Sequence, residues 1–285
     1  MDEKFFSLWP LILFTVLLPV AVGLVAGAAL AVWLTDIASK DVLTALWWAL
    51  GLTVISGVLV SFHLGHVERS MSAVRGIKHS NLSHEILLAY GFVFLLTAGL
   101  VCIYISGPET LIRTVLGLGG VLGLAAVISI GRVYKLPGQI TWRGNIPSLG
   151  PFTGSMLTAV VIFHVLAGAF DIPMVFGGAF WLFLALDGLF TAKRFRDFLL
   201  LEHSQYILVY PRQKTVVKFC YGLKLMLTAG VVVLFIREYY TTVLMVVGLG
   251  MLLDRTAFYA SAARKTPKVN IAVAKAERMQ AALNS

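Results

Sequence analysis

Residues 8–34 read LWPLILFTVLLPVAVGLVAGAALAVWL, an apolar stretch without a single charged side chain. A helix needs about 20 such residues to cross the hydrocarbon core of a bilayer. Because a lipid-exposed backbone must satisfy its own hydrogen bonds, spans of this kind are expected to be helices. Seven further apolar stretches follow, at 42–62, 86–105, 111–131, 152–170, 173–193, 216–236 and 240–260. The pattern predicts an all-α integral membrane protein with eight transmembrane helices in one bundle and both termini on the same side.

The composition of the whole chain indicates the same class. Of its 285 residues, 59% are hydrophobic and 13% are charged, and the mean hydropathy is +0.88. Soluble domains are about 25% charged, so a soluble globular enzyme is excluded. We expect an eight-helix domain over residues 1–260 and a basic tail over 261–285. The first span is expected to be retained, because it is longer than the apolar core of a signal peptide.

The Lys and Arg residues are distributed unevenly between the two predicted faces. Lys40, Arg113 and Arg237 fall on one face and Lys224 lies inside a span, whereas all others fall on the face that holds the termini. Cytoplasmic loops are enriched in Lys and Arg, so the termini are expected in the cytoplasm. The net charge of +9 is therefore attributed to topology and not to nucleic-acid binding. This basic face also carries the long loops, which favours a protein partner there, at 63–85, 132–151 and 194–215.

Ionisable side chains at or near the span ends are expected to form one polar layer beneath the basic face. Such groups are costly within a membrane, so each is a candidate functional residue. A quinone dissolved in the bilayer needs an apolar slot with a few polar groups that hold its ring oxygens and pass on protons. Histidine suits proton transfer near neutral pH, which favours His63, although this residue could instead merely cap its span. The layer comprises His63, His66, His84, Glu85, Arg132, Tyr134, Asp187, Lys224, Asp254 and Arg255.

Other roles are considered for several ionisable residues. Asp187 and Lys224 are expected to form a structural ion pair between neighbouring spans. His164 lies deeper in the membrane, where no second histidine is available for a bis-histidine haem, so it is expected to be a hydrogen-bonded packing residue. His63 and His84 lie at matching depth, but no haem is expected. The two cysteines lie far apart in apolar runs and predict neither a disulfide framework nor a metal site.

Three segments of the basic face carry a more specific pattern. The first runs from His63-Leu64-Gly65 through Arg69 and Arg75 to Leu82-Ser83-His84-Glu85-Ile86. The other two are weaker: Arg132-Val133-Tyr134 ahead of Thr141-Trp142, and Arg255-Thr256-Ala257-Phe258-Tyr259. Together they resemble the membrane-anchor subunit of the dimethyl sulfoxide reductase type of molybdoenzyme. Chain length and span number are similar to that family over nearly the whole chain.

The resemblance implies a quinone-reactive anchor that oxidises menaquinol, or reduces quinone, and exchanges electrons with a docked iron–sulfur subunit. It places the family's functional histidine on His63 and its third-helix carboxylate on Glu85, both as catalytic proton acceptors. The quinone-binding residues would be His63, His66, His84, Arg132, Tyr134 and Arg255. The partner-docking residues would be Arg69, Arg75, Lys78, Arg143, Arg194 and Arg196.

The resemblance also implies how cofactors are divided in the complex. An iron–sulfur electron-transfer subunit and a molybdopterin catalytic subunit would hold the redox cofactors, while this chain would bind menaquinone or another quinone. The complex would lie in the cytoplasmic membrane of a bacterium or archaeon. A small-molecule or ion transporter, and a purely structural anchor without a working quinone site, are the alternative functions.

The chain departs from the family's pattern at a few positions. Val67 stands where proline is common, Asp254 stands where glycine is common, and His84 stands where another charged or amide residue is common. An acid beside Arg255 could neutralise it and change its affinity for quinone. The charge asymmetry places the docking face in the cytoplasm, whereas the better-known anchors place it outside. The terminal substrate, the electron direction and the quinone type are left open.

Overall fold

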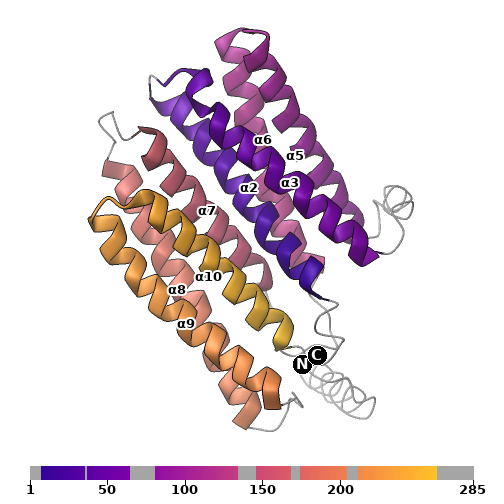
Figure 1. Ribbon diagram of the computed structural model, residues 1–285, viewed down its shortest axis with the longest axis vertical. Coiled ribbons are helices and arrows are strands. Elements are labelled where there is room, and N and C mark those ends of the chain that lie inside the picture. Colours follow the sequence, from indigo (N-terminus) through magenta and orange to yellow (C-terminus); the bar gives the residue numbers. More distant parts are fainter. Residues whose placement is uncertain are drawn as a thin grey trace, which may run out of the picture.

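A computed structural model describes residues 8–35, 37–64, 81–133, 146–167, 174–203 and 211–261. Within these ranges the regular structure is helical (Figure 1). One short 3-10 helix, η1 (Ser39–Val42), precedes α3. The α-helices are α2 (Trp9–Leu34), α3 (Leu43–Leu64), α5 (Asn81–Tyr104), α6 (Glu109–Val133), α7 (Ile146–Ala167), α8 (Met174–His203), α9 (Pro211–Ile236) and α10 (Tyr240–Ala260).

Each apolar stretch of the sequence coincides with one of these helices, which confirms the all-α prediction. Seven of the eight α-helices in the described ranges are long and apolar enough to cross a membrane. Helix α8 is not among the seven. Its last third carries the charged side chains Lys193, Arg194, Arg196, Asp197 and Glu202. With 30 residues it is also the longest helix described.

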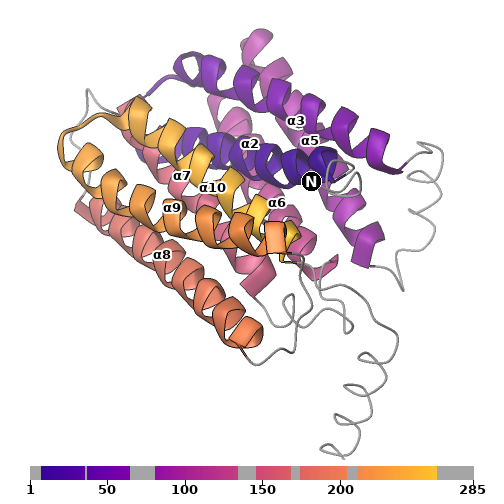
Figure 2. The ribbon, with the colours of Figure 1, turned by 60° about the horizontal axis from the view of Figure 1, so that its bottom comes forward.

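The helices form two groups that meet along α2 and α7. Helix α2 packs against α3, α6, α7 and α10, and α7 packs against α2, α6, α8 and α10. Helices α3 and α5 lie on one side of this pair, whereas α8 and α9 lie on the other (Figures 1 and 2). The bundle therefore has a half built from α2, α3, α5 and α6 and a half built from α7–α10.

Close contact between α2 and α7 depends on glycine. A Cβ on Gly27 would overlap Cγ2 of Ile162 and the carbonyl oxygen of Ala159. The hydroxyl of Ser155 on α7 donates a 2.8 Å hydrogen bond to the carbonyl oxygen of Pro19 on α2. Small residues let helix backbones approach in this way within membranes.

The outward faces of the bundle are strongly apolar. Phe62 on α3 is 77% exposed, Phe94 on α5 is 71% exposed and Trp48 on α3 is 67% exposed. Apolar surface of this extent is unusual on a soluble monomer. It is the surface that lipid chains would cover, in agreement with a multi-pass membrane protein.

Candidate functional site

Those residues of the predicted layer that the structure describes lie in two regions, one in each half of the bundle. His63, Glu85 and Arg132 belong to α3, α5 and α6. Asp187, Lys224 and the pair Asp254–Arg255 belong to α8, α9 and α10. Helix α5 packs against α3 and α6, whereas α10 packs against α2, α7 and α9. The predicted single layer is therefore split into two regions, with the central helices α2 and α7 between them.

The first region is formed where α3 ends and α5 begins. His63 lies in the last turn of α3, one residue before its end, and its side chain is outside the described part of the structure. Glu85 is the fifth residue of α5 and is only 6% exposed. Its neighbour His84 is exposed, because consecutive helical positions point about 100° apart. Arg132, at the end of α6, is exposed as well.

Glu85 is the most informative residue of this region. A carboxyl group buried at the end of a membrane helix is costly, so the position is a candidate for function by default. Helices α3 and α5 are consecutive and in contact, so the end that bears His63 and the start that bears Glu85 lie at the same end of the bundle. Other predicted site residues lie outside the described ranges, namely His66, Arg69, Arg75, Lys78, Tyr134 and Arg143.

The second region centres on Asp254 of α10, which three cations approach. Oδ2 of Asp254 lies 3.0 Å from Nη1 of Arg194 and 3.4 Å from Nη2 of Arg255. Its Oδ1 lies 3.6 Å from Nζ of Lys224. Tyr221 of α9 also lies within interaction range of Arg194. Arg255 is 1% exposed and Arg194 is 8% exposed, so neither side chain reaches the surface.

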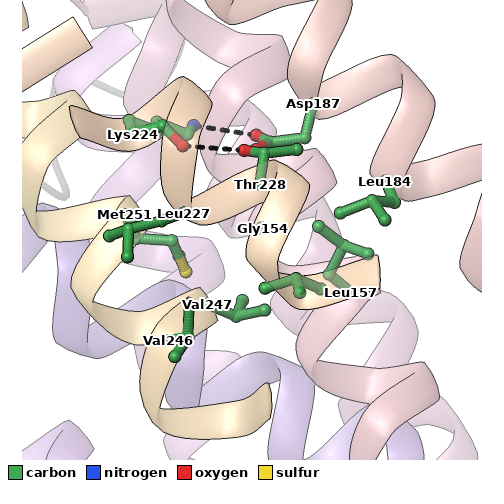
Figure 3. A pocket seen from close by; sticks show the side chains of 12 residues that line it. Gly154, Leu157, Leu184, Asp187, Lys224, Leu227, Thr228, Val246, Val247 and Met251 are labelled. Carbon is green, nitrogen blue, oxygen red and sulfur yellow. Dashed lines mark hydrogen bonds and ion pairs between the residues drawn. The ribbon is translucent and has the colours of Figure 1, made fainter. Parts of the chain in front are cut away.

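Asp187 extends this cluster toward the interior of the membrane. Nζ of Lys224 lies 3.0 Å from Oδ1 of Asp187, which confirms the predicted ion pair between α8 and α9 (Figure 3). The hydroxyl of Thr153 on α7 donates a 3.1 Å hydrogen bond to the same oxygen. We term the five charged side chains the ionic layer: Asp187, Arg194, Lys224, Asp254 and Arg255.

A small cavity lies beside the pair of Asp187 and Lys224 (Figure 3). Its volume is about 20 Å³, which is room for about one water molecule. Apart from this pair and Thr228, its walls are apolar side chains and glycines of α7–α10. The cavity is too small for a quinone, so it does not extend the candidate quinone site.

The two predicted docking residues that the structure describes, Arg194 and Arg196, differ in burial. Arg194 is buried in the ionic layer, where the sequence pattern had suggested a surface role. A Cβ on Gly150 would overlap its Nη2, so a larger residue at this position of α7 would force the guanidinium to shift. Arg196 is 69% exposed at its side chain and lies 3.1 Å from Asp197. Of the two, only Arg196 is presented to a partner in this arrangement.

Sequence reasoning did not join the charged groups of α8, α9 and α10 into one cluster. Asp187 and Arg194 are seven residues apart, which places them on the same face of α8 two turns apart. That spacing was a usable signal, and the pairing of Asp187 with Lys224 was predicted, but no pattern in the sequence indicates that Asp254 of α10 meets Arg194 and Lys224. Arg255, expected near the quinone, belongs to this cluster and not to the helix ends that carry His63 and Glu85.

His164 takes the predicted packing role. It is 4% exposed, and its Nδ1 lies 2.7 Å from the carbonyl oxygen of Val160 one turn earlier. Its ring centroid lies 5.2 Å from that of Phe235 and 5.6 Å from that of Tyr240. An aromatic environment and one backbone hydrogen bond account for this residue without a ligand.

Comparison with protein families identifies the architecture. Residues 1–201 match the model of the DMSO reductase anchor subunit (DmsC) family, which is more than half of the chain. The chain belongs to this family. As a DMSO reductase anchor subunit it is a membrane anchor of a molybdoenzyme complex, a class that implies catalytic and iron–sulfur partner subunits. No curated protein and no solved structure matches the chain significantly.

The family match covers one of the two polar regions of this anchor subunit completely and the other only in part. It covers α2 through most of α8 and includes His63, Glu85, Asp187 and Arg194. Helices α9 and α10 lie beyond it, and with them Lys224, Asp254 and Arg255. The region at the ends of α3 and α5 therefore belongs entirely to the matched part, whereas the ionic layer joins matched and unmatched helices.

Proposed function

We propose that this anchor subunit is the quinone-reactive subunit of its complex, which oxidises menaquinol and passes the electrons to a docked iron–sulfur subunit. The observation that carries the proposal is Glu85, a buried carboxyl group at the start of α5 in a chain of this family. The adjoining end of α3 bears His63, the residue of the His-Leu-Gly motif. The two residues supply the acid–base groups that quinol oxidation requires.

In this proposal His63 and Glu85 act as proton acceptors. Oxidation of a quinol to a quinone releases its two hydroxyl protons and two electrons. A side chain that accepts a proton must lie within hydrogen-bond reach of the quinol oxygen. The imidazole of His63 takes one proton at a ring nitrogen and the carboxylate of Glu85 takes the other. The electrons leave to the iron–sulfur subunit, and both protons leave to water on the basic face.

The basic face would receive the partner subunits. Its docking residues in the proposal are Arg196, which is exposed, together with Arg69, Arg75, Lys78 and Arg143. An acidic surface on the iron–sulfur subunit would complement them. By the distribution of Lys and Arg this face is cytoplasmic, and α8 completes an eight-span topology with both termini on that side. His84, Arg132 and other residues of this face would line the entrance of the quinone.

Quinol-dependent turnover of the assembled complex tests the site. We expect Glu85→Gln and His63→Ala each to lower turnover by about 100-fold or more, the usual contribution of general acid–base catalysis. Glu238→Gln is the matched control, because Glu238 is an exposed acid in the turn between α9 and α10. Unchanged turnover of both site variants, at limiting and at saturating quinol, would contradict the assignment.

Co-purification separates the proposed function from a purely structural anchor. In a structural anchor, the iron–sulfur and catalytic subunits would co-purify with the chain, but no quinol analogue would bind or be oxidised. In a transporter, substrate flux would occur in proteoliposomes without any partner. The proposal expects the partners, with their iron and molybdenum, and quinol oxidation together.

A further inference from the structure

The ionic layer contains more cations than anions. Arg194, Lys224 and Arg255 face Asp187 and Asp254, so with every group ionised the layer carries one surplus positive charge. All five residues are between 1% and 8% exposed. Buried charges are tolerated only when they are paired with good geometry, because each has lost its hydration. One acid therefore has to neutralise more than one base, and Asp254 is in ion-pair range of all three.

Apolar side chains enclose the layer on both sides along each helix. On α8, Leu184 precedes Asp187, and Phe198 follows Arg194. On α9 the corresponding residues are Val217 and Val231, and on α10 they are Met251 and Phe258. Phe198, Val217 and Phe258 belong to one buried cluster, whereas Leu184, Val231 and Met251 belong to another. The charges thus lie between two apolar clusters.

This arrangement makes the charge pairing sensitive to how far each helix is inserted. A slip of α9 by one turn would move Lys224 about 5.4 Å along the bundle, away from Oδ1 of Asp187. The same slip would place a lysine in an apolar cluster and would leave a carboxylate without its main cation. Apolar contacts among Leu, Val and Phe tolerate such a slip far better, because their surfaces are chemically alike.

We propose that the ionic layer is a charge-pairing lock that holds α9 and α10 in one register against α8. Asp254 is its centre because Arg194, Lys224 and Arg255 all approach this one carboxylate. Asp187 secures Lys224 from the α8 side. The lock joins the helices beyond the family match to those within it, and it is independent of the proposed quinone chemistry.

Removal of single charges tests the lock. Asp187→Asn or Asp254→Asn raises the surplus to two positive charges while keeping the size of the side chain. Lys224→Met makes the layer neutral overall but leaves the Asp187 carboxylate without its ion-pair partner. Loss of either acid should therefore open the lock, and so should loss of this lysine, because each leaves a buried charge unpaired. The lysine substitution should rescue Asp187→Asn, because it removes the cation that Asp187 secures.

Cys220 offers a local probe of opening. It lies one turn before Lys224 on α9 and is 4% exposed. The experiment uses the full chain in lipid nanodiscs with Cys102→Ser, so that Cys220 is the single thiol, and follows its modification by N-ethylmaleimide. Modification of a buried thiol reports the transient separation of the helices that cover it.

We expect Asp187→Asn and Asp254→Asn to label at least about tenfold faster than the parent chain, which corresponds to a tenfold larger open fraction. Lys224→Met should also label at least about tenfold faster, whereas Asp187→Asn combined with Lys224→Met should label within about threefold of the parent chain, because no charge of that pair is left unpaired. The matched controls are Glu202→Gln and Lys218→Met, which alter a peripheral ion pair between the same two helices. These controls should leave the labelling rate unchanged.

Three results would overturn the lock. They are no acceleration by either acid variant, no acceleration by Lys224→Met, and failure of the double variant to return toward the parent rate. If Asp187→Asn cannot be isolated in folded form, the yield of folded chain replaces labelling. Adding Lys224→Met should then recover that yield, and no recovery would count against the proposal. None of these measurements involves quinol, so they separate the lock from the proposed function.

Discussion

Nζ of Lys224 on α9 lies 3.0 Å from Oδ1 of Asp187 on α8, and both residues are at most 6% exposed. The pair is fixed from a third helix by Thr153 of α7, whose hydroxyl donates to the same carboxylate oxygen. A neutral hydroxyl can only modulate the pair, whereas the ammonium neutralises it. Thr153 therefore offers a way to weaken the pair without changing any charge.

We expect Thr153→Val to lower the free energy of unfolding by about 1.5–3 kcal/mol, because a hydrogen bond to a charged group is lost. Thr97→Val is the control, since Thr97 is exposed and its hydroxyl donates to the carbonyl oxygen of Val93 in its own helix. The measurement is thermal unfolding in one detergent. Equal midpoints for the two variants would show that Thr153 does not support the pair.

Gly27 should be the least replaceable small residue in the contact between α2 and α7. A methyl group there would overlap Cγ2 of Ile162 and the backbone of Ala159, and the backbone cannot yield cheaply. We expect Gly27→Ala to cost about 1–3 kcal/mol, the usual range for overpacking. Gly51→Ala is the matched control, because Gly51 is also helical and a Cβ there meets nothing within 4 Å. A chain that tolerates both equally would refute the close helix contact.

Gly250→Ala should stabilise the protein. Gly250 lines the cavity of about 20 Å³, and a Cβ there would lie 3.9 Å from Cγ of Lys224, an ordinary contact distance. Alanine in a helix is about 1 kcal/mol more favourable than glycine, and the methyl group also fills part of the cavity. We expect a higher unfolding temperature. A lower unfolding temperature would mean that another group already occupies the space that the added methyl group would take.

His164→Phe should leave quinol oxidation intact. The substitution removes the hydrogen bond to Val160 but keeps an aromatic ring beside Phe235 and Tyr240. We expect a stability loss of about 1 kcal/mol and unchanged turnover of the complex. Loss of turnover in a chain that still folds and assembles would give His164 a role beyond packing.

Arg196→Glu should weaken assembly on the proposed docking face. The side chain is 69% exposed, and reversal of its charge would repel an acidic surface of the iron–sulfur subunit. We expect less partner to co-purify at low ionic strength, with a smaller difference in high salt because exposed charges are screened. Arg237→Glu, in the turn between α9 and α10 at the other end, is the control. Equal recovery of the partner with both variants would show that Arg196 is not part of the docking surface.

The helices were predictable because their signal is local. An apolar run of about 20 residues has few alternatives to a membrane helix, and each of the eight runs coincides with a helix. The pairing of Asp187 with Lys224 was predictable for a related reason, since two isolated opposite charges on consecutive spans have strong cause to meet. Glu85 was singled out by its motif, and the structure adds that its side chain is buried.

Tertiary structure alone decided how the polar residues divide. By sequence position, Arg255 and Glu85 approach the same face, and the two appeared to belong to one layer. Helices α2 and α7 lie between the groups, so Glu85 belongs with the end of α3, whereas Arg255 meets Asp254 and Arg194. The physical reason is that position along the chain sets the depth of a residue in the membrane. Its neighbours at that depth depend on which helix faces fit together, and that is decided by contacts between helices distant in sequence.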